Sequence, residues 1–489
     1  MLFTSLEFLA FLPLTLIVFA LLPVGQRWVW LLLASYSFYG IWQPSNLLYL
    51  GAVTILVYGC GRGMQAVEGR ARSAYLVAGL VAVLGSLFAF KFYDFIAGEV
   101  ERLARQAAGG GLVFSLPRIG VSAPAGYSFY AFSAASYLID AYTRRLAEEP
   151  GAGRLALYVA YFPKIFAGPI ERATTFLPQV WNGLRANPDG LVLALQLIVW
   201  GLFKKVVIAD NLAPLVDRNF AIAAFATPME LLISIYFFAF QIYCDFSGYT
   251  DIAIGVSLLF GIRLMENFRR PYLSRSTAEF WAERWHISLG RWFRDYLYIP
   301  LGGSRAGALR RGMNVMAVFL VSGLWHAGLG YGVGWTFLIW GALNGFYQWV
   351  GLATRSFWRG AAAVMPRVGG SRVLLVVRIL LTFHLIAIAW VFFRAKSVGD
   401  AVLILRKIGA RLTELPALLL KYPFTAEHLM GFCLIGLLLA VEILDERRPV
   451  FDRLAAAPVW LRWCVYYLAI FALLILGRWQ AKEFIYMQF

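Results

Sequence analysis

The stretch GMNVMAVFLVSGLWHAGLGYGVGWTFLIWGALNGFYQWVGLAT, residues 312–354, contains no Lys, Arg, Asp or Glu in 43 consecutive positions. A helix rises about 1.5 Å per residue, and the hydrocarbon core of a bilayer is about 30 Å thick. The stretch is therefore long enough for two membrane crossings. It also contains His326, so a titratable imidazole is expected at membrane depth.

Apolar stretches of this kind recur along the whole chain. Of its 489 residues, 61% are hydrophobic and only 15% are charged, a far more apolar composition than that of a soluble domain. Counting the longest stretches as pairs predicts about eleven transmembrane helices. The first, Phe8 to Gln26, follows an acidic residue and lacks a basic leader, so we expect a membrane helix there and not a cleaved signal. The predicted fold class is all-α, polytopic and transmembrane.

No soluble domain of useful size fits between the apolar stretches, so residues 1–489 are expected to form one transmembrane domain. Four parts can be distinguished within it. They are N-terminal helices (1–262), a cytoplasmic interfacial segment rich in arginine (263–311), the helices around His326 (312–354) and C-terminal helices (355–489).

The net charge of +17 is concentrated in short segments between apolar stretches, where basic residues set membrane topology. No nucleic-acid partner is therefore predicted. If the N-terminus starts outside, most basic groups fall on one side, which should be the cytoplasm. These groups are Arg62, Arg70 and Arg72; Arg144 and Arg145; residues 263–311; and Arg355, Arg359, Arg367 and Arg372. The basic stretch 394–421 falls on the other side or lies flat on the membrane surface.

Two segments do not fit a simple spanning helix, and a third is less suited to contact with lipid. Residues 263–311 contain ten arginines, four acids and many aromatic residues, which favours short interfacial helices packed against the bundle. Residues 161–178 contain three prolines, and broken backbone at membrane depth is tolerated only where protein or water surrounds it. Residues 124–142 are rich in Ala, Ser and Tyr, as expected for close helix packing or a cavity wall.

The four histidines differ in their surroundings. His326 is followed by Gly328, Gly330, Gly332 and Gly334 and preceded by Gly323, which would let a backbone or a substrate approach closely. Burial would keep its imidazole neutral and able to accept a proton. The residues alone leave open whether it is catalytic or structural. His286 fits an interfacial histidine, His384 a packed one bonded to a backbone carbonyl, and His428 a surface one.

Asp245 and Asp251 interrupt an apolar stretch, and each carboxylate needs a partner at that depth. We expect an arginine of residues 263–311 to supply it. The four cysteines, Cys60, Cys244, Cys433 and Cys464, form no CxxC pair and have no histidine at ligand spacing, which predicts small core residues with neither a disulfide nor a metal site. Phosphate-loop, GxSxG and HExxH motifs are absent.

Six motifs carry a resemblance to a known family. They are PAGYSFYAFSAASYLIDAY (124–142), FPKIFAGPIER (162–172), FKKVVIADNLA (203–213), QIYCDFSGYTDIAIG (241–255), ENFRRPYLSRSTAEFWAERWHISLGRWFRDYLYIPLGG (266–303) and GLWHAGLG (323–330). In this order they resemble the membrane-bound O-acyltransferase family, in particular the bacterial branch that includes the membrane subunit of alginate O-acetyltransferase. The resemblance extends to about residue 350, and the remaining chain matches in hydropathy alone.

The resemblance implies that His326 is the catalytic histidine and His286 a second functional residue. Substrate-binding or supporting positions are implied at Trp325, Trp285, Asp245, Tyr243, Ser247, Arg291, Arg294, Asp295, Tyr298 and Asn344. Two departures stand out. Ala327 follows His326 where the family usually has Gly, and Leu343 and Asn344 stand where near relatives often have another Trp-His-Gly.

The resemblance also implies a ring of helices around a central tunnel, in a multi-pass protein of the bacterial inner membrane. It implies transfer of an acetyl group from a cytoplasmic thioester, acetyl-coenzyme A or an acyl carrier, with no permanently bound cofactor. A periplasmic or membrane-anchored acyltransferase would relay the group to an exported polysaccharide such as alginate, within a biosynthesis or export complex in contact with membrane lipid. Aminoacyl transfer from a carrier protein, a transporter and a non-catalytic scaffold remain as alternatives.

Overall fold

The computed structural model describes residues 1–109, 115–120, 123–146, 148–185, 188–305, 307–327, 334–354, 371–479 and 484–485, with the backbone alone at Trp42 and Asp189. Within these ranges the chain is helical, and the one β-type pairing is an isolated bridge between Phe268 and Trp285. The predicted all-α class is confirmed. Of the glycines near His326, Gly328, Gly330 and Gly332 lie outside the described residues.

The helices of the first half are α1 (Leu6–Leu21), α2 (Arg27–Trp42), α3 (Ser45–Ala66), α4 (Gly69–Leu80), α5 (Ser86–Ala107), α6 (Tyr127–Tyr142), α7 (Ala152–Ala160), α8 (Ala173–Trp181), α9 (Leu191–Leu202), α10 (Asp210–Ala221) and α11 (Pro228–Leu259). Two π-helical segments continue helices without a break. Val81–Gly85 joins α4 to α5, and Phe203–Ala209 joins α9 to α10. Each wider turn changes which residues of the following helix face the core.

The helices of the second half are α12 (Thr277–Glu279), α13 (Ile287–Phe293), α14 (Ala308–His326), α15 (Gly334–Ala353), α18 (Arg372–Arg394), α19 (Val398–Gly409), α20 (Leu415–Lys421), α21 (Ala426–Arg447), α22 (Val450–Ala455) and α23 (Val459–Leu476). The arginine-rich segment folds into short pieces, as expected. Besides α12 and α13 these are Pro271–Leu273, Phe280–Arg284 and Arg294–Tyr298.

Seven helices among the described residues are long and apolar enough to cross a membrane. They are Ser45–Ala66, Gly69–Ala107, Leu191–Ala221, Pro228–Leu259, Arg372–Arg394, Ala426–Arg447 and Val459–Leu476. The charge-free stretch 312–354 folds into two helices, α14 and α15, as predicted, although neither is among the seven. The multi-pass character is confirmed, whereas the total of about eleven spans is not.

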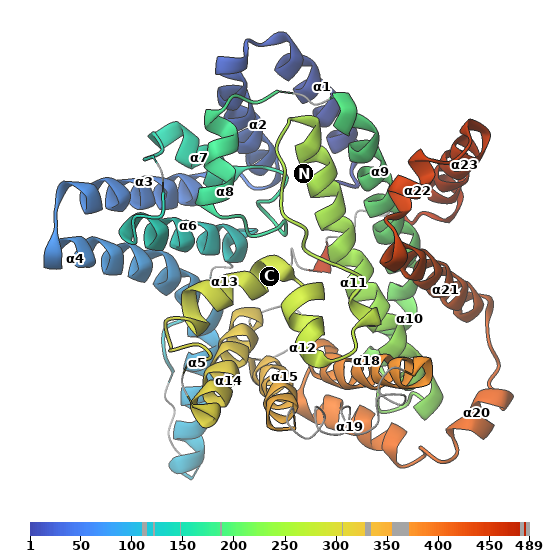
Figure 1. The fold of residues 1–489 in the computed structure, drawn as a ribbon. Helices are drawn as coiled ribbons and strands as arrows, with labels where there is room; N and C mark the ends of the chain where they lie inside the picture. Colours follow the sequence, from blue (N-terminus) through green and yellow to red (C-terminus); the bar gives the residue numbers. More distant parts are fainter. Residues whose placement is uncertain are drawn as a thin grey trace.

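The helices surround a centre that is occupied by α11, α12 and α13 (Figure 1). In the most apolar part of α11, 89% of the residues are buried, against 6% for α23 at the periphery. The exposed leucines, isoleucines and tryptophans of α23 suit contact with lipid. The tunnel that the resemblance implies stays a prediction.

The broken segment after α7 lies inside the protein, as its three prolines predict. Residues 161–168 are non-helical and fully buried. Their backbone finds partners nearby, because the Phe162 amide donates to Ser35 Oγ at 3.1 Å. Gly126, at the start of the almost entirely buried α6, has φ 73°, and a Cβ there would lie 2.4 Å from the Ile165 carbonyl oxygen. Only glycine fits this contact.

Small residues allow two helix pairs to approach closely, as is typical of helices packed within membranes. Between α14 and α15, a Cβ on Gly341 would lie 2.4 Å from the Phe319 carbonyl oxygen, and a Cβ on Gly323 would lie 2.5 Å from the Phe337 carbonyl oxygen. Between α9 and α11, a Cβ on Gly201 would lie 2.6 Å from a carbonyl oxygen of the facing helix. The α14–α15 contact is what holds His326 against its neighbours.

Two consecutive lysines of the π-helical segment Phe203–Ala209 supply the partners of the acids in α11. Lys204 Nζ lies 2.6 Å from Asp251, and Lys205 Nζ lies 2.7 Å from Asp245. The expected pairing of both aspartates with arginines of residues 263–311 is therefore wrong. The wide π turn directs both lysines toward α11, a geometry that regular helical periodicity does not predict. The second oxygen of Asp245 accepts a hydrogen bond from the Ile485 amide at 2.7 Å.

The arginine-rich segment is fixed instead by acids at the end of α21. Arg270 forms ion pairs with Asp445 and Glu446, and Arg284 lies 2.8 Å from Glu446. Arg284 also lies 2.8 Å from Glu279 of α12. These contacts join the centre of the ring to its C-terminal helices.

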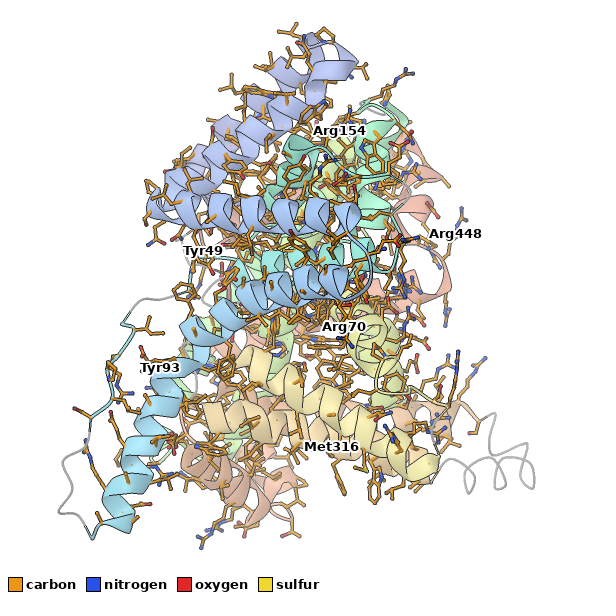
Figure 2. All side chains as sticks on the ribbon, turned by 90° about the vertical axis from the view of Figure 1, so that its left-hand side faces the viewer. Tyr49, Arg70, Tyr93, Arg154, Met316 and Arg448 are labelled. Carbon is orange, nitrogen blue, oxygen red and sulfur yellow. The ribbon has the colours of Figure 1, made fainter. Side chains whose placement is uncertain are left out.

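Basic residues near the ends of α3, α4 and α6 gather at one side of the molecule. Arg72 donates to the carbonyl oxygens of Ala141 and Tyr142 at the end of α6, and Arg62 pairs with Glu149 at 2.8 Å. Figure 2 shows Arg70 and Arg448 toward one side and Tyr49 and Tyr93 toward the other. Arg355, Arg359 and Arg367 of the predicted basic side lie outside the described residues, so the one-sided distribution of positive charge and its assignment to the cytoplasm stay predictions.

We expect Gly341→Ala to destabilise the protein, because the added methyl group would collide with the α14 backbone. Overpacking of this kind costs about 1–3 kcal/mol. Gly351→Ala is the matched control on the same helix, since nothing lies within 4 Å of its Cβ position. Thermal unfolding in detergent should give a lower Tm for Gly341→Ala and an unchanged or higher Tm for the control. Equal Tm values for the two variants would contradict the packing argument.

We expect Asp245→Asn to lower the free energy of unfolding by about 1–3 kcal/mol, because the buried Lys205 then keeps only Asp210, at 3.0 Å, as its carboxylate partner. The exposed pair between Arg411 and Glu414 supplies the control, and Glu414→Gln should have little effect. Denaturant titration of both variants measures the difference. A negligible effect of Asp245→Asn would show that the pair does not stabilise the bundle.

Candidate active site

His326 is the last residue of α14, and its side chain is only 3% exposed. Its Nδ1 lies 2.7 Å from the Ser322 carbonyl oxygen, one helical turn earlier. A carbonyl oxygen can only accept a hydrogen bond, so Nδ1 carries the proton. The neutral imidazole then has its lone pair on Nε2, which is the state that a general base requires.

Aromatic rings from different helices enclose His326. The ring centroids lie 4.6 Å away for Trp325, 5.0 Å for Trp340 of α15 and 5.5 Å for Phe393 of α18. All three rings are themselves buried. The imidazole is therefore placed in apolar surroundings, where electrostatic interactions are stronger than in water.

His286 comes from the arginine-rich segment and lies next to the same tryptophan. It precedes α13 with φ 46°, a left-handed conformation that is costly for a residue other than glycine. Its ring centroid lies 4.7 Å from Phe246 of α11 and 6.2 Å from Trp325. Burial, and to a smaller extent the neighbouring His326, lowers the pKa of the His286 imidazole well below its usual value. The structure thus brings together the two histidines that the sequence predicts.

Tryptophans of the arginine-rich segment extend the layer of aromatic rings around His326, which we call the aromatic wall. The ring of Trp281 lies 5.5 Å from Trp340, and that of Trp285 lies 5.0 Å from Trp390 of α18. Asn344 joins two of these elements, since its amide donates to the Trp340 carbonyl at 2.8 Å and its oxygen accepts from Trp281 Nε1 at 3.0 Å. Of the predicted supporting residues, Trp325 contacts both histidines, and Trp285 and Asn344 lie one layer behind.

Three indole N–H groups in this wall lack a partner within the described part of the chain. They belong to Trp325, Trp340 and Trp390, each at least nine-tenths buried. A buried donor without a partner costs about 1–3 kcal/mol. Donors left in this state around a histidine are suited to the polar atoms of a substrate.

Lys91 of α5 is a site residue that the sequence reasoning missed. Its Nζ donates to the Trp325 carbonyl oxygen at 2.9 Å and lies 5.4 Å from the centroid of the Trp325 indole. The side chain is 8% exposed. One signal was available, because Lys91 interrupts the apolar sequence LFAFKFY within a predicted membrane helix, and an ionisable residue there indicates function.

The predicted positions on α11 lie away from His326. Asp245 is paired with Lys205, and the Tyr243 hydroxyl donates to Glu442 of α21. The Tyr243 ring lies 6.1 Å from Trp285, so it touches the wall from behind. Ser247 is fully buried, and its hydroxyl has no hydrogen-bond partner among the residues described.

The predicted positions after His286 lie toward the surface. Arg291 and Arg294 are exposed. Arg294 Nε lies 2.8 Å from Asp295, and Asp295 in turn lies 3.4 Å from Arg172. Tyr298 is half-buried in the segment Arg294–Tyr298. No contact between these four residues and His326 occurs in the described structure.

The other two histidines have structural surroundings. His384 Nδ1 lies 2.7 Å from the Leu380 carbonyl oxygen, as predicted, and its Nε2 lies 2.9 Å from the Tyr236 hydroxyl. The surface position expected for His428 is wrong. Its ring is 4% exposed and caps the start of α21 through Thr425, because the chain before the helix folds back over it.

The cysteines are free thiols, and the described ranges contain no group of His, Cys, Asp and Glu placed to hold a metal ion. Cys244 is buried, as predicted for a small core residue. Cys433 and Cys464 are exposed, which corrects the same prediction for them. They lie on the outward faces of α21 and α23, where an apolar environment comes from lipid and not from a core.

Comparison with known proteins identifies the family of this chain. The model of the MBOAT, membrane-bound O-acyltransferase family matches residues 121–393. The chain is 37% identical to the "Probable alginate O-acetylase" of Azotobacter vinelandii over 82% of this chain and 76% of that protein. It is 33% identical to the "Peptidoglycan O-acetyltransferase" of Helicobacter pylori over 80% and 78%, and 26% identical to the "Teichoic acid D-alanyltransferase" of Bacillus subtilis over 55% and 68%. The chain is a member of the membrane-bound O-acyltransferase family and an acyltransferase.

Proposed function

We propose that this protein is an O-acetyltransferase that passes an acetyl group from a cytoplasmic thioester across the inner membrane for O-acetylation of an exported polysaccharide. The observation that carries the proposal is the buried His326, held in one tautomer by Ser322 and enclosed by Trp325 and Trp340. The relatives named as O-acetylases and O-acetyltransferases support the reaction class.

In the proposed reaction, His326 Nε2 accepts the proton of an acceptor hydroxyl as its oxygen bonds to the thioester carbonyl carbon. The carbon–sulfur bond then breaks, and the thiolate takes the proton from the imidazolium. General-base catalysis of this kind contributes about 10²- to 10⁴-fold. Holding donor and acceptor together adds a further entropic gain. His286, across Trp325, orients the thioester or relays the proton.

Acetyl-coenzyme A is the proposed donor, and it enters from the side of the arginine-rich segment. Arg291 and Arg294 are exposed there and suited to the phosphate groups of coenzyme A. The acceptor on the other side is a periplasmic or membrane-anchored acyltransferase, which passes the acetyl group to a polymer such as alginate. The name of the Azotobacter vinelandii relative supports this polymer.

Transfer of an aminoacyl group from a carrier protein is the second candidate function. The relative from Bacillus subtilis, named as a teichoic acid D-alanyltransferase, supports it. Both reactions use the same attack of a hydroxyl on a thioester, so His326 has the same role in each. A transporter or scaffold, in contrast, would keep working without the imidazole.

We expect His326→Ala to reduce acetyl transfer from radiolabelled acetyl-coenzyme A by at least about 100-fold, because the general base is lost. His286→Ala should also reduce it. The assay uses membranes that contain the full chain and compares equal amounts of folded protein. His384→Ala is the matched control, because its Nδ1 makes the same 2.7 Å bond to a backbone carbonyl on another helix. Unchanged transfer in His326→Ala would exclude the mechanism and leave a transporter or scaffold.

The two donors can be separated in the same membranes. We expect label from acetyl-coenzyme A to reach the envelope polymer in a reaction that depends on His326. Label from a D-alanyl carrier protein should not reach it, because the exposed arginines favour the phosphates of coenzyme A, whereas a carrier protein docks through its own surface. The reverse pattern would assign the aminoacyl reaction.

A further inference from the structure

Lys91 lies beside His326 but has no part in the proton transfers proposed above. Its ammonium donates to the backbone carbonyl of Trp325, the residue next to His326, at 2.9 Å. The position of this charge is set by α5, whose start is shifted by the π-helical segment Val81–Gly85.

Among the residues that the structure describes, Lys91 lacks the carboxylate partner that other buried lysines of the bundle have. Lys204 and Lys205 are equally buried, and each is paired with a carboxylate of α11. Lys91 forms no ion pair with the described residues, and its Nζ lies over the Trp325 indole instead. A buried lysine without a counter-ion is costly, so its presence indicates a function.

A purely structural role accounts for part of this arrangement. The Trp325 carbonyl belongs to the last turn of α14, where carbonyl oxygens lack partners within the helix and a cation is favourable. Capping this carbonyl uses one N–H of the ammonium. The other two N–H groups make no hydrogen bond within the described structure.

A second donor belongs to the same residue. The indole nitrogen of Trp325 is buried and has no partner among the described residues, and the ammonium lies 5.4 Å from the centroid of this indole. The lysine nitrogen over this indole and the indole N–H therefore both lie at the residue that precedes His326. Donors fixed in advance at the reacting centre are the means by which enzymes stabilise developing negative charge.

We infer that Lys91 is a further catalytic residue, which with the indole N–H of Trp325 stabilises the negative charge on the acyl carbonyl oxygen. This role rests on the proposed function. As the hydroxyl oxygen bonds to the carbonyl carbon, the π electrons of the C=O bond move to oxygen. When the carbon–sulfur bond breaks, the electron pair on oxygen re-forms the C=O bond. The thiolate leaves with the electron pair of the broken carbon–sulfur bond. The ammonium keeps all of its protons throughout.

The test measures initial rates of acetyl transfer in inverted vesicles that contain the full chain, over a range of radiolabelled acetyl-coenzyme A concentrations. The variants are Lys91→Met, which keeps the length of the side chain but not the charge, and Lys91→Arg, which keeps the charge. Lys164→Met is the matched control, because Lys164 is a buried lysine that packs on Tyr158 away from His326. Wild type and His326→Ala are measured in parallel, and rates are divided by the amount of folded protein.

We expect Lys91→Met to lower kcat about 100-fold, the loss typical of removing one donor to an oxyanion. The apparent KM should change less than about threefold, because the interaction forms only in the transition state. Lys91→Arg should recover part of kcat, and Lys164→Met should keep the wild-type kcat.

Two results would overturn the role of Lys91. One is a kcat of Lys91→Met close to that of wild type. The other is a loss of folded protein with an unchanged kcat per molecule, which would assign the lysine to capping of α14 alone. Absence of His326-dependent transfer in the wild type is a different outcome, because it refutes the proposed function itself and the role of Lys91 with it.

Discussion

Polar groups buried among apolar residues must find their partners within the protein, and this constraint organises the whole bundle. Lys205 and Asp245 satisfy each other between the π-helical segment and α11. The broken backbone after α7 is satisfied by Ser35 of a neighbouring helix. His326 differs from these groups, because its Nδ1 is satisfied by its own helix while its other face is enclosed by aromatic rings.

The aromatic wall explains how distant parts of the chain make one site. Helices α14, α15 and α18 contribute Trp325, Trp340 and Phe393, and the arginine-rich segment contributes His286. Each element is placed by a different force. Close glycine contacts hold α14 against α15, whereas ion pairs to α21 hold the arginine-rich segment. The site therefore depends on both packing and charge.

Much of this arrangement could be predicted from the sequence. Charge-free stretches predict membrane helices because length and hydropathy are sufficient for that step, and the family motifs identify His326 and His286. The partners of Asp245 and the position of Lys91 could not be predicted in this way. Lys205 lies within one π-helical segment and Lys91 follows another, and such segments change the helical register without any clear signal in the sequence. The left-handed backbone at His286 could not be predicted either, because the residue at this position is not a glycine.

The contact between Asp245 and the Ile485 amide joins residues that are 240 positions apart. During synthesis, α11 leaves the ribosome long before the segment that completes the surroundings of this carboxylate. Until that segment is made, one oxygen of Asp245 lacks this hydrogen bond. The surroundings of this carboxylate are therefore complete only after residue 485 has been synthesised, although the helix that carries it is made much earlier.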